Sequence, residues 1–309
     1  MHKVIVFGSL NMDMSVQCRT VPRRGETEIG DKFLTTPGGK GGNQAVAAAR
    51  MGADTFMVGK VGDDPEGRAL VASLARHGVA CTNVSVSETE QTGRAVVIRA
   101  EGDNRIVVDP AANASMTYQE VRAAIHGLSG TGNIFLTQLE GDFETTMQSI
   151  LCAKRNGFYT VLNASPARSI PAEVYKALDL LCVNESECEL LTGIDPTNDE
   201  ARENALWYFD AQGVKNAVIT LGRRGSVALI DDKYVKIPTY RVDTVDTTGA
   251  GDAYLGELVA HLAFGGDLRE SMVYASACAA LCVGKVGSQA AMPTWDEVDS
   301  FVAEHGGLK

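Results

Sequence analysis

Short apolar runs alternate with segments of helical periodicity through the middle of the chain. Runs of four or five apolar residues are typical of strands buried on both faces, and apolar residues spaced three and four apart indicate amphipathic helices. These patterns predict strands at 134–137, 160–163 and 180–184, and helices at 143–156, 171–178 and 186–192. Because strands and helices take turns, we expect an α/β fold with a doubly wound, mostly parallel sheet and helices on both faces.

Both ends of the chain extend this pattern. Residues 3–8 predict a first buried strand, 217–219 predict another, and 226–238 predict a hairpin that turns at Asp231 and Asp232, while a β-rich run ends at Asp246. Helices are expected from the Ala-rich segment that ends at Met51, behind Pro65, behind the capping box of Thr117 and Glu120, at 252–264, at 269–284 and behind Thr294.

Two β-rich segments do not fit the alternation of strands and helices. Residues 14–36 contain the short pieces 14–18 and 29–34 with no helix between them, and residues 92–110 contain a hairpin of 95–99 and 105–108 with Gly102 in its turn. Parallel strands need long crossovers, so these pieces belong to a separate small sheet. We predict an α/β domain of residues 1–13, 37–91 and 111–309, and a small β unit of 14–36 and 92–110.

The richest chemistry lies where the β-rich run meets the helix at 252–264. Gly249-Ala250-Gly251 precede Asp252, and Leu255, Leu258, Val259 and Leu262 form the apolar stripe of that helix. Free N–H groups at a helix N-terminus face anions, and glycines let a ligand approach the backbone. An acid among such amides suits a base that deprotonates a hydroxyl while the amides hold a phosphoryl group. An ordinary Gly-rich turn with Asp252 as the N-cap is the alternative.

Other polar groups follow predicted strands. Asn11 and Asp13 come after the first strand, where α/β sheets bind ligands, although an Asx turn is the alternative. Glu140 ends the strand at 134–137 and needs water, a partner or a ligand. Lys40 stands among four glycines, but the segment is neither a P-loop nor G-x-G-x-x-G. Asn184 to Glu187 alone favours a capped helix start.

Composition narrows the possible partners. The chain has 45% hydrophobic and 22% charged residues, as in soluble globular enzymes. Its net charge of -11 argues against nucleic-acid and membrane partners. The sequence has no apolar run of transmembrane length, no signal-peptide pattern, and seven scattered cysteines without a C-x-x-C pair. We expect a cytoplasmic protein with reduced thiols and no structural zinc.

Seven motifs, in order along nearly the whole chain, resemble those of the ribokinase family of sugar kinases. They are N-x-D from Asn11, G-G-K-G-x-N-Q-A from Gly38, V-G-x-D-x-x-G from Val61, Q-L-E from Gln138, N-x-x-E from Asn184, T-x-G-x-x-G from Thr220 and D-T-T-G-A-G-D from Asp246. The family's fold is the α/β sheet described above, with the small β unit as a lid over the site. In that family the lids of two subunits clasp, so the resemblance implies a homodimer.

The resemblance also implies a role for each matching residue. Asp252 is the catalytic base, and the amides of Gly249, Ala250 and Gly251 form the anion hole. The sugar is bound by Asn11, Met12, Asp13, Gly39, Lys40, Gly41, Gly42, Asn43, Glu140 and Asp252. The nucleotide site comprises Asn184, Glu187, Thr220, Leu221, Gly222, Arg223, Arg224, Gly225, Gly251, Asp252 and Ser276. A monovalent cation is held, mostly through carbonyls, by Asp246, Thr248, Cys282, Lys285, Gly287 and Ala291.

The implied activity is transfer of the ATP γ-phosphate to the 5-hydroxyl of D-ribose, giving D-ribose 5-phosphate and ADP, with Mg²⁺ and activation by K⁺. A kinase for deoxyribose, a ketohexose or a nucleoside is the alternative within the family. Outside it stand a nucleotide-linked oxidoreductase, which the missing G-x-G-x-x-G disfavours, and a sugar sensor without catalysis, which Asp252 disfavours. The chain departs from the family pattern at Asn163 to Ala167, at Asp109 to Ala114 and at Ser276.

Overall fold

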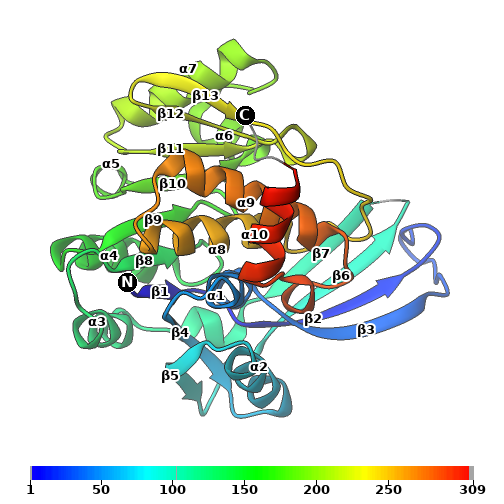
Figure 1. Cartoon of the computed structure of the whole chain (residues 1–309). Helices are drawn as coiled ribbons and strands as arrows, with labels where there is room; N and C mark the ends of the chain where they lie inside the picture. The colour runs from blue at the N-terminus through cyan, green and yellow to red at the C-terminus, as the bar shows by residue number, and fades with distance from the viewer. Residues whose placement is uncertain (1, 102, 306–309) are drawn as a thin grey trace.

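A nine-stranded sheet forms the centre of the computed structural model, which describes residues 2–101 and 103–305 (Figure 1). The strand order is β13-β12-β11-β10-β9-β8-β1-β4-β5, with only β12 and β13 antiparallel to their neighbours. The strands are β1 (Val4–Phe7), β4 (Thr55–Gly62), β5 (Ala80–Ser87), β8 (Ile134–Thr137), β9 (Tyr159–Asn163), β10 (Leu180–Asn184), β11 (Ala217–Thr220), β12 (Ser226–Ile230) and β13 (Lys233–Ile237).

Helices cover both faces of this sheet. One face packs against α1 (Lys40–Arg50), α2 (Pro65–Arg76), α8 (Ala250–Ala263), α9 (Leu268–Val283) and α10 (Trp295–Glu304). The other packs against α3 (Tyr118–Gly127), α4 (Phe143–Arg155), α5 (Ala172–Tyr175), α6 (Glu185–Thr192) and α7 (Asp199–Ala211). Strand β1 shows why both faces need cover, because its side chains alternate between them. Val4 and Val6 pack in the core on the first face, and Ile5 and Phe7 pack in the core on the second. The predicted doubly wound α/β fold is confirmed.

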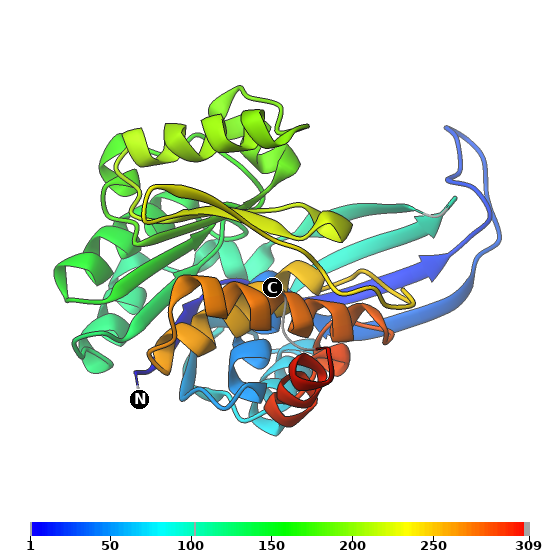
Figure 2. The ribbon, with the colours of Figure 1, turned by 45° about the horizontal axis from the view of Figure 1, so that its top comes forward.

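A separate four-stranded sheet of order β3-β2-β6-β7 projects from one side of the molecule (Figure 2). Its strands are β2 (Asn11–Gln17), β3 (Asp31–Gly38), β6 (Gly93–Ala100) and β7 (Asp103–Asp109). We call it the lid sheet. The predicted hairpin of β6 and β7 is confirmed, whereas its expected turn residue Gly102 lies outside the described residues. Asn11 and Asp13 belong to β2 itself, so they do not form an Asx turn after β1.

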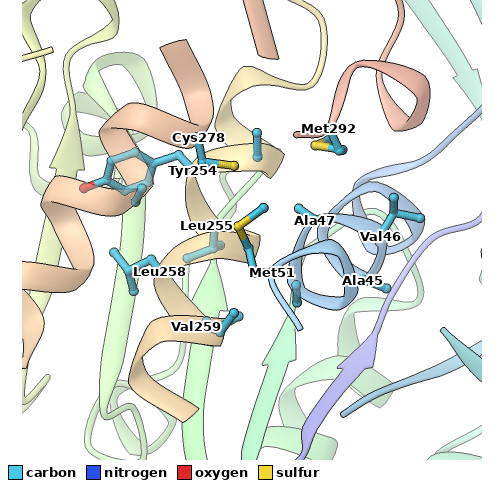
Figure 3. Close-up of a cluster of buried hydrophobic side chains, with 14 of the residues drawn as sticks. Ala45, Val46, Ala47, Met51, Tyr254, Leu255, Leu258, Val259, Cys278 and Met292 are labelled. Atoms are coloured by element: carbon cyan, nitrogen blue, oxygen red, sulfur yellow. The ribbon is translucent and has the colours of Figure 1, made fainter. Parts of the chain in front are cut away.

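Helix α8 lies against helix α1 (Figure 3). Gly256, which has no side chain, allows the two helices to approach this closely. A Cβ atom on Gly256 would stand 2.4 Å from the Cβ atom of Ala47 and 2.8 Å from the carbonyl oxygen of Gln44. Around this contact Met51, Leu255 and Val259 are buried in the larger core. The spacing of the two helices matters for the site, since each begins with residues that meet at Asp252.

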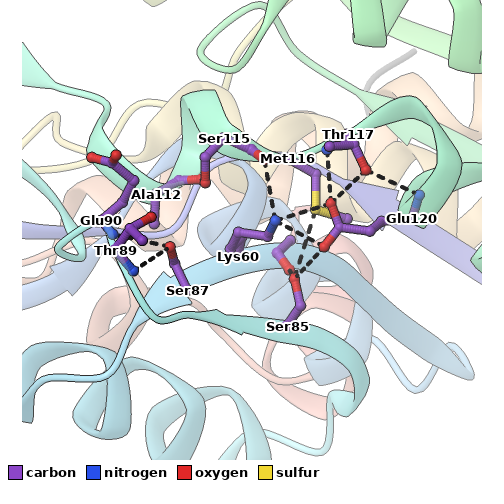
Figure 4. Close-up of polar contacts among 11 residues, drawn as sticks. Lys60, Ser85, Ser87, Thr89, Glu90, Ala112, Ser115, Met116, Thr117 and Glu120 are labelled. Carbon is purple, nitrogen blue, oxygen red and sulfur yellow. Dashed lines mark hydrogen bonds and ion pairs between the residues drawn. The ribbon is translucent and has the colours of Figure 1, made fainter.

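A polar cluster joins strands β4 and β5, at one edge of the nine-stranded sheet, to helix α3 (Figure 4). Lys60 Nζ on β4 donates to a carboxylate oxygen of Glu120 at 2.9 Å and to the Ser115 carbonyl oxygen at 3.1 Å. Ser85 on β5 donates to the other oxygen of Glu120 at 3.2 Å, and Glu120 also closes the predicted capping box with Thr117. The Lys60 and Thr117 hydrogen bonds lower the pKa of Glu120 to about 2, although its partial burial opposes this.

The structure corrects the sequence-based elements at several places. Strands β4 and β5 and helix α7 were not predicted. The helix expected at 171–178 is a single turn, α5, and the expected β-rich run up to Asp246 is wrong, because residues 238–249 form no strand. No helix among residues 2–101 and 103–305 is long and apolar enough to cross a membrane.

Candidate active site

Asp252 lies in the first turn of α8, where Gly249 is the N-cap. Gly249 takes φ 78°, a left-handed conformation that favours glycine and turns the chain into the helix. A Cβ atom on Gly251 would meet nothing within 4 Å, so the backbone here is open to a ligand. The Asp252 side chain is buried, with 9% of its surface exposed. The predicted anion hole and base are thus adjacent at one helix N-terminus, where the Ala250 amide donates to the Thr247 carbonyl oxygen at 3.3 Å.

Two amides from α1 hold the Asp252 carboxylate. Asn43 Nδ2 donates to Oδ2 at 2.9 Å, and Gln44 Nε2 donates to Oδ1 at 2.9 Å. Burial raises the pKa of Asp252, while the charge of Lys40 and these two hydrogen bonds oppose the rise. A buried carboxylate with a raised pKa that also accepts two hydrogen bonds has the properties of a general base.

Acidic and basic groups meet next to Asp252. Lys40 Nζ lies 3.8 Å from Glu140 Oε1, the Lys40 amide donates to Glu140 Oε2 at 3.1 Å, and Ser9 Oγ also donates to Glu140 Oε2. Burial, with the charges of Glu140 and Asp252, raises the pKa of Asp13 to about 7. Although burial opposes it, the carboxylates of Asp252 and Glu140 raise the pKa of Lys40. This cluster offers several hydrogen-bonding groups to a polyhydroxylated ligand.

Small residues let these groups come together. Gly39 is the N-cap of α1 with φ 85°, and a Cβ atom there would lie 2.7 Å from the Asn11 amide nitrogen. A Cβ atom on Gly38 would lie 2.1 Å from the Asp13 carboxylate, and one on Gly41 would lie 2.6 Å from the backbone of Gly8. Met12 is buried beneath this surface. The glycines predicted at the sugar site therefore serve close backbone packing around it.

A cavity of about 730 Å³ opens on the other side of the anion-hole loop. Six of the predicted nucleotide residues line it: Thr220, Gly222, Arg223, Gly225, Gly251 and Ser276. They come from β11, the short helix Gly222–Arg224, α8 and α9. Ala250 and Tyr254 also line it. Its size suits a nucleotide-sized ligand.

Five predicted nucleotide residues lie outside the lining, and Asp252, described above, is one of them. Leu221 is buried in the core, and the Arg224 guanidinium pairs with Glu185. Asn184 and Glu187 form a reciprocal capping box on α6, with the Asn184 amide donating to Glu187 Oε2 at 2.8 Å. The charge of Glu187 nevertheless contributes to the raised pKa of Lys40.

Asp246 connects three parts of the chain ahead of the anion hole. Its Oδ1 accepts from the Thr248 amide at 3.0 Å and from the Thr248 hydroxyl at 2.7 Å. Its Oδ2 accepts from the Gly287 amide at 3.2 Å and lies 3.4 Å from a guanidinium nitrogen of Arg99, on lid strand β6. These donors lower the pKa of Asp246 although burial opposes them.

Besides Thr248 and Gly287, the end of α9 lies beside Asp246. Both the Val245 and the Asp246 amides donate to the Val283 carbonyl oxygen, which brings the end of α9 beside the loop. Cys282 and Ala291 are buried, and Lys285 Nζ points to Glu297 Oε1 at 2.9 Å. In the described part of the chain, no three His, Cys, Asp or Glu side chains are grouped to hold a metal ion.

Sequence reasoning missed four side chains at the site: Gln44, Asn113, Gln138 and Arg99. Asn113 Nδ2 donates to Asn11 Oδ1 at 2.8 Å, and its Oδ1 accepts from the Leu10 amide at 2.8 Å. Gln44 in an Ala-rich helix and Gln138 behind an apolar strand are polar residues at core positions, which was a usable signal. Arg99 carried no such signal, because an arginine in an alternating strand is not unusual.

This chain is similar to known proteins over nearly its whole length. A family model described as pfkB family carbohydrate kinase matches residues 1–295. The chain is 36% identical over 303 residues to the ribokinase of Bacillus subtilis, covering 98% of this chain and 100% of that protein. It is 32% identical over 303 residues to the deoxyribokinase of Salmonella typhi, covering 97% of this chain and 98% of that protein.

Solved structures are similar to this chain over nearly its whole length. The ribokinase of Thermotoga maritima matches with a TM-score of 0.88 and 32% identity, covering 98% of this chain and 100% of that chain. The Arabidopsis thaliana ribokinase complexed with ribose and ATP matches with a TM-score of 0.88 and 30% identity, covering 98% of this chain and 99% of that chain.

Proposed function

Because this chain belongs to the pfkB family of carbohydrate kinases, we propose that it transfers the γ-phosphoryl group of ATP to the 5-hydroxyl of D-ribose. The products are D-ribose 5-phosphate and ADP. One observation carries the proposal: a buried carboxylate, Asp252, stands in the first turn of α8 between the polar cluster of Lys40 and Glu140 and the cavity of about 730 Å³. The relatives named ribokinase support ribose as the acceptor.

Asp252 is the proposed base. It accepts the proton of the sugar hydroxyl as the oxygen of that hydroxyl attacks the γ-phosphorus, and the bond to the ADP oxygen breaks. Its raised pKa makes it a stronger base than an exposed carboxylate. The amides of Gly249, Ala250 and Gly251 lie at the same helix terminus and stabilise the negative charge on the transferring group.

Each substrate has its own proposed set of residues. Asn11, Asp13, Asn43 and Glu140, with the backbone of residues 39–42, hold the sugar hydroxyls. The nucleotide occupies the cavity along Thr220, Gly222, Arg223, Gly225 and Ser276. Asn184, Leu221 and Arg224 do not line the cavity.

Magnesium on the nucleotide phosphates supplies positive charge to the transferring group. The residues present fit that requirement, because Asn184 at the end of β10 and Glu187 in the first turn of α6 carry the oxygen atoms that such an ion and its water molecules take. We assign Asn184 and Glu187 to the organisation of the water shell of this ion.

A monovalent cation, with K⁺ expected, is proposed beside Asp246. Asp246, Thr248, Cys282, Lys285, Gly287 and Ala291 supply one carboxylate and several carbonyl groups, which are the oxygen donors such an ion takes. Hydrogen bonds already join these segments, so the donors fit one site. A cation bound there holds the loop before Gly249 without touching substrate.

The lid sheet is proposed to clasp the lid of a second copy and to form, with residues 14–36 and 92–110, a unit separate from the α/β domain. Large apolar side chains support this, because Phe33, Ile106 and Val107 on the lid are 64%, 59% and 71% exposed. Exposed apolar groups on edge strands favour association of two copies.

Deoxyribose is the second candidate acceptor, since the deoxyribokinase of Salmonella typhi is also a full-length relative. The two differ in the 2-hydroxyl group, for which a site built around Asp13, Asn43 and Glu140 offers acceptors and an amide. The comparison of both sugars is described below.

The test of the base is Asp252→Asn. Turnover is expected to fall by about 10²–10⁴ with sugar binding largely kept, because the amide cannot take the proton. Asp199→Asn is the matched control: Asp199 is also an acid in a first turn, that of α7, and it pairs with Arg202 and Lys236 away from the site. An Asp252→Asn enzyme with near-normal turnover would exclude Asp252 as the base.

A further inference from the structure

Two buried glutamine amides form a chain that ends on Asp252. Gln138 Nε2 donates to Gln44 Oε1 at 2.7 Å, and Gln44 Nε2 donates to Asp252 Oδ1 at 2.9 Å. Gln44 is 0% exposed and Gln138 is 2% exposed. The first follows Asn43 in α1, and the second follows β8, separated only by Leu139 from the sugar-side residue Glu140. Burying two such polar side chains costs free energy unless their polar atoms form hydrogen bonds.

The chain of amides has a fixed direction. A primary amide has a donor end and an acceptor end, and Gln138 fills the acceptor end of Gln44. The donor end of Gln44 therefore faces Asp252, and it also donates to Asn163 Oδ1 at 3.1 Å. In the reverse orientation, the Gln44 carbonyl oxygen would face a carboxylate oxygen with no proton between them. Gln138 thus pairs with the acceptor end of Gln44 and leaves its donor end for Asp252, although Gln138 does not touch Asp252 itself.

We propose that Gln44 and Gln138 are positioning residues, which hold the Asp252 carboxylate in the orientation that takes the proton of the sugar hydroxyl. With Asn43 on Oδ2 and Gln44 on Oδ1, both oxygens are held and the carboxylate cannot rotate freely. The proposal rests on Asp252 acting as the base. It also links the base to the segment that carries Glu140, so that binding of sugar and removal of its proton share one rigid support.

Charged and titratable groups surround Asp252 on all sides. Lys40 comes from α1, Asp13 from β2, Glu140 from the segment behind β8, and the Cys282 thiol from α9. These groups remain in a variant of Gln44 or Gln138, so a shift between variant and parent reports the lost hydrogen bond. A donor favours the ionised form of an acid, and removing the donor raises its pKa. The base is active when ionised, so the acidic limb of the rate profile then moves to higher pH.

The experiment measures kcat/KM for the sugar against pH in Gln44→Met, Gln138→Met and Gln44→Glu, with Asn133→Leu as the control. Methionine keeps the length of glutamine and removes its polar atoms. We expect the acidic limb to move up by about one pH unit in Gln44→Met, less in Gln138→Met and more in Gln44→Glu, where a carboxylate faces Asp252. KM for ATP is expected to stay unchanged.

Asn133 is a matched control because it is a buried amide at the opposite end of β8. It accepts from the Lys3 amide at 2.9 Å and donates to the Leu128 carbonyl oxygen at 3.1 Å, far from Asp252. Asn133→Leu should lower thermal stability without moving the acidic limb. If Gln44→Met does not fold, Gln138→Met carries the test, since Gln138 does not contact the base.

An acidic limb that stays in place in Gln44→Met or Gln138→Met, or that moves equally in Asn133→Leu, overturns the proposal. Failure of the proposed function looks different, because it would appear as near-normal turnover in Asp252→Asn. The two outcomes are therefore distinguishable in one set of variants.

Discussion

Replacing Gly256 by alanine tests whether the spacing of α1 and α8 sets the geometry of the base. The added Cβ atom would lie 2.4 Å from the Cβ atom of Ala47, whereas apolar carbons pack at about 3.5–4.0 Å. Helix α8 must then withdraw from α1 by about 1 Å at this point. Asp252 stands one turn earlier on the same helix, on the face that α1 covers, so it moves with Gly256.

That movement breaks the contacts of the base. The Asn43 and Gln44 donors lie 2.9 Å from the Asp252 oxygens, and an added separation of about 1 Å takes them beyond the range of a hydrogen bond. A misplacement of this size costs about 10²-fold in kcat. Stability changes less, because overpacking costs about 1–3 kcal/mol while alanine in a helix regains about 0.5–1 kcal/mol over glycine.

The assay is coupled ADP release for kcat and urea unfolding for stability. Gly127→Ala is the control, because a Cβ atom there meets nothing within 4 Å. It should leave kcat unchanged and leave stability equal or slightly higher. Adding Ala47→Gly to Gly256→Ala should restore part of the lost rate, since it removes the atom in contact at 2.4 Å. A Gly256→Ala enzyme that is destabilised but keeps its kcat would refute the reasoning.

Three further predictions concern stability, substrate and ions. Glu120 has a pKa lowered to about 2, so Glu120→Gln should be less stable than the parent at pH 7, and urea unfolding should show the difference vanishing as the pH falls from about 4.5 towards 2. Ribose should exceed 2-deoxyribose in kcat/KM by at least about 10-fold, because buried donors and acceptors are left unpaired without the 2-hydroxyl. A higher kcat/KM for deoxyribose in a side-by-side assay would identify deoxyribose as the substrate. Replacing K⁺ by a bulky organic cation should lower the rate, and Asp246→Asn should remove this response, whereas equal rates in both buffers count against the cation site.

Local patterns were sufficient for much of the fold. The alternation of apolar strands and helices predicted the central sheet, because its parallel strands are buried on both faces. Strand β5 escaped notice, since Ala80–Ser87 is polar, half-exposed and at the edge of the sheet. Val242 and Val245 favoured a strand that does not form: the Val245 amide donates to the Val283 carbonyl oxygen instead of a neighbouring strand.

Only those parts of the site that lie within a single sequence motif could be predicted. Glycines before Asp252 announced an anion hole because their chemistry is local. The partners of Asp252 were not visible, since Gln44 lies 208 positions away and its orientation depends on Gln138. Likewise, nothing near Lys60 in the sequence indicates Glu120, which lies 60 positions further on. Such contacts exist only after distant elements have packed.

The four donors gathered by Asp246 bear on how this chain can be recombined with its homologues. Its carboxylate meets the loop at Thr248, the segment at Gly287 and lid residue Arg99, which is 147 positions away. A chimera that receives the lid strands of another kinase replaces Arg99 with that kinase's residue and leaves Asp246 with a partner it was not matched to. Crossovers should therefore succeed when the three segments are inherited together, and swaps of one segment should need a compensating change at the other two.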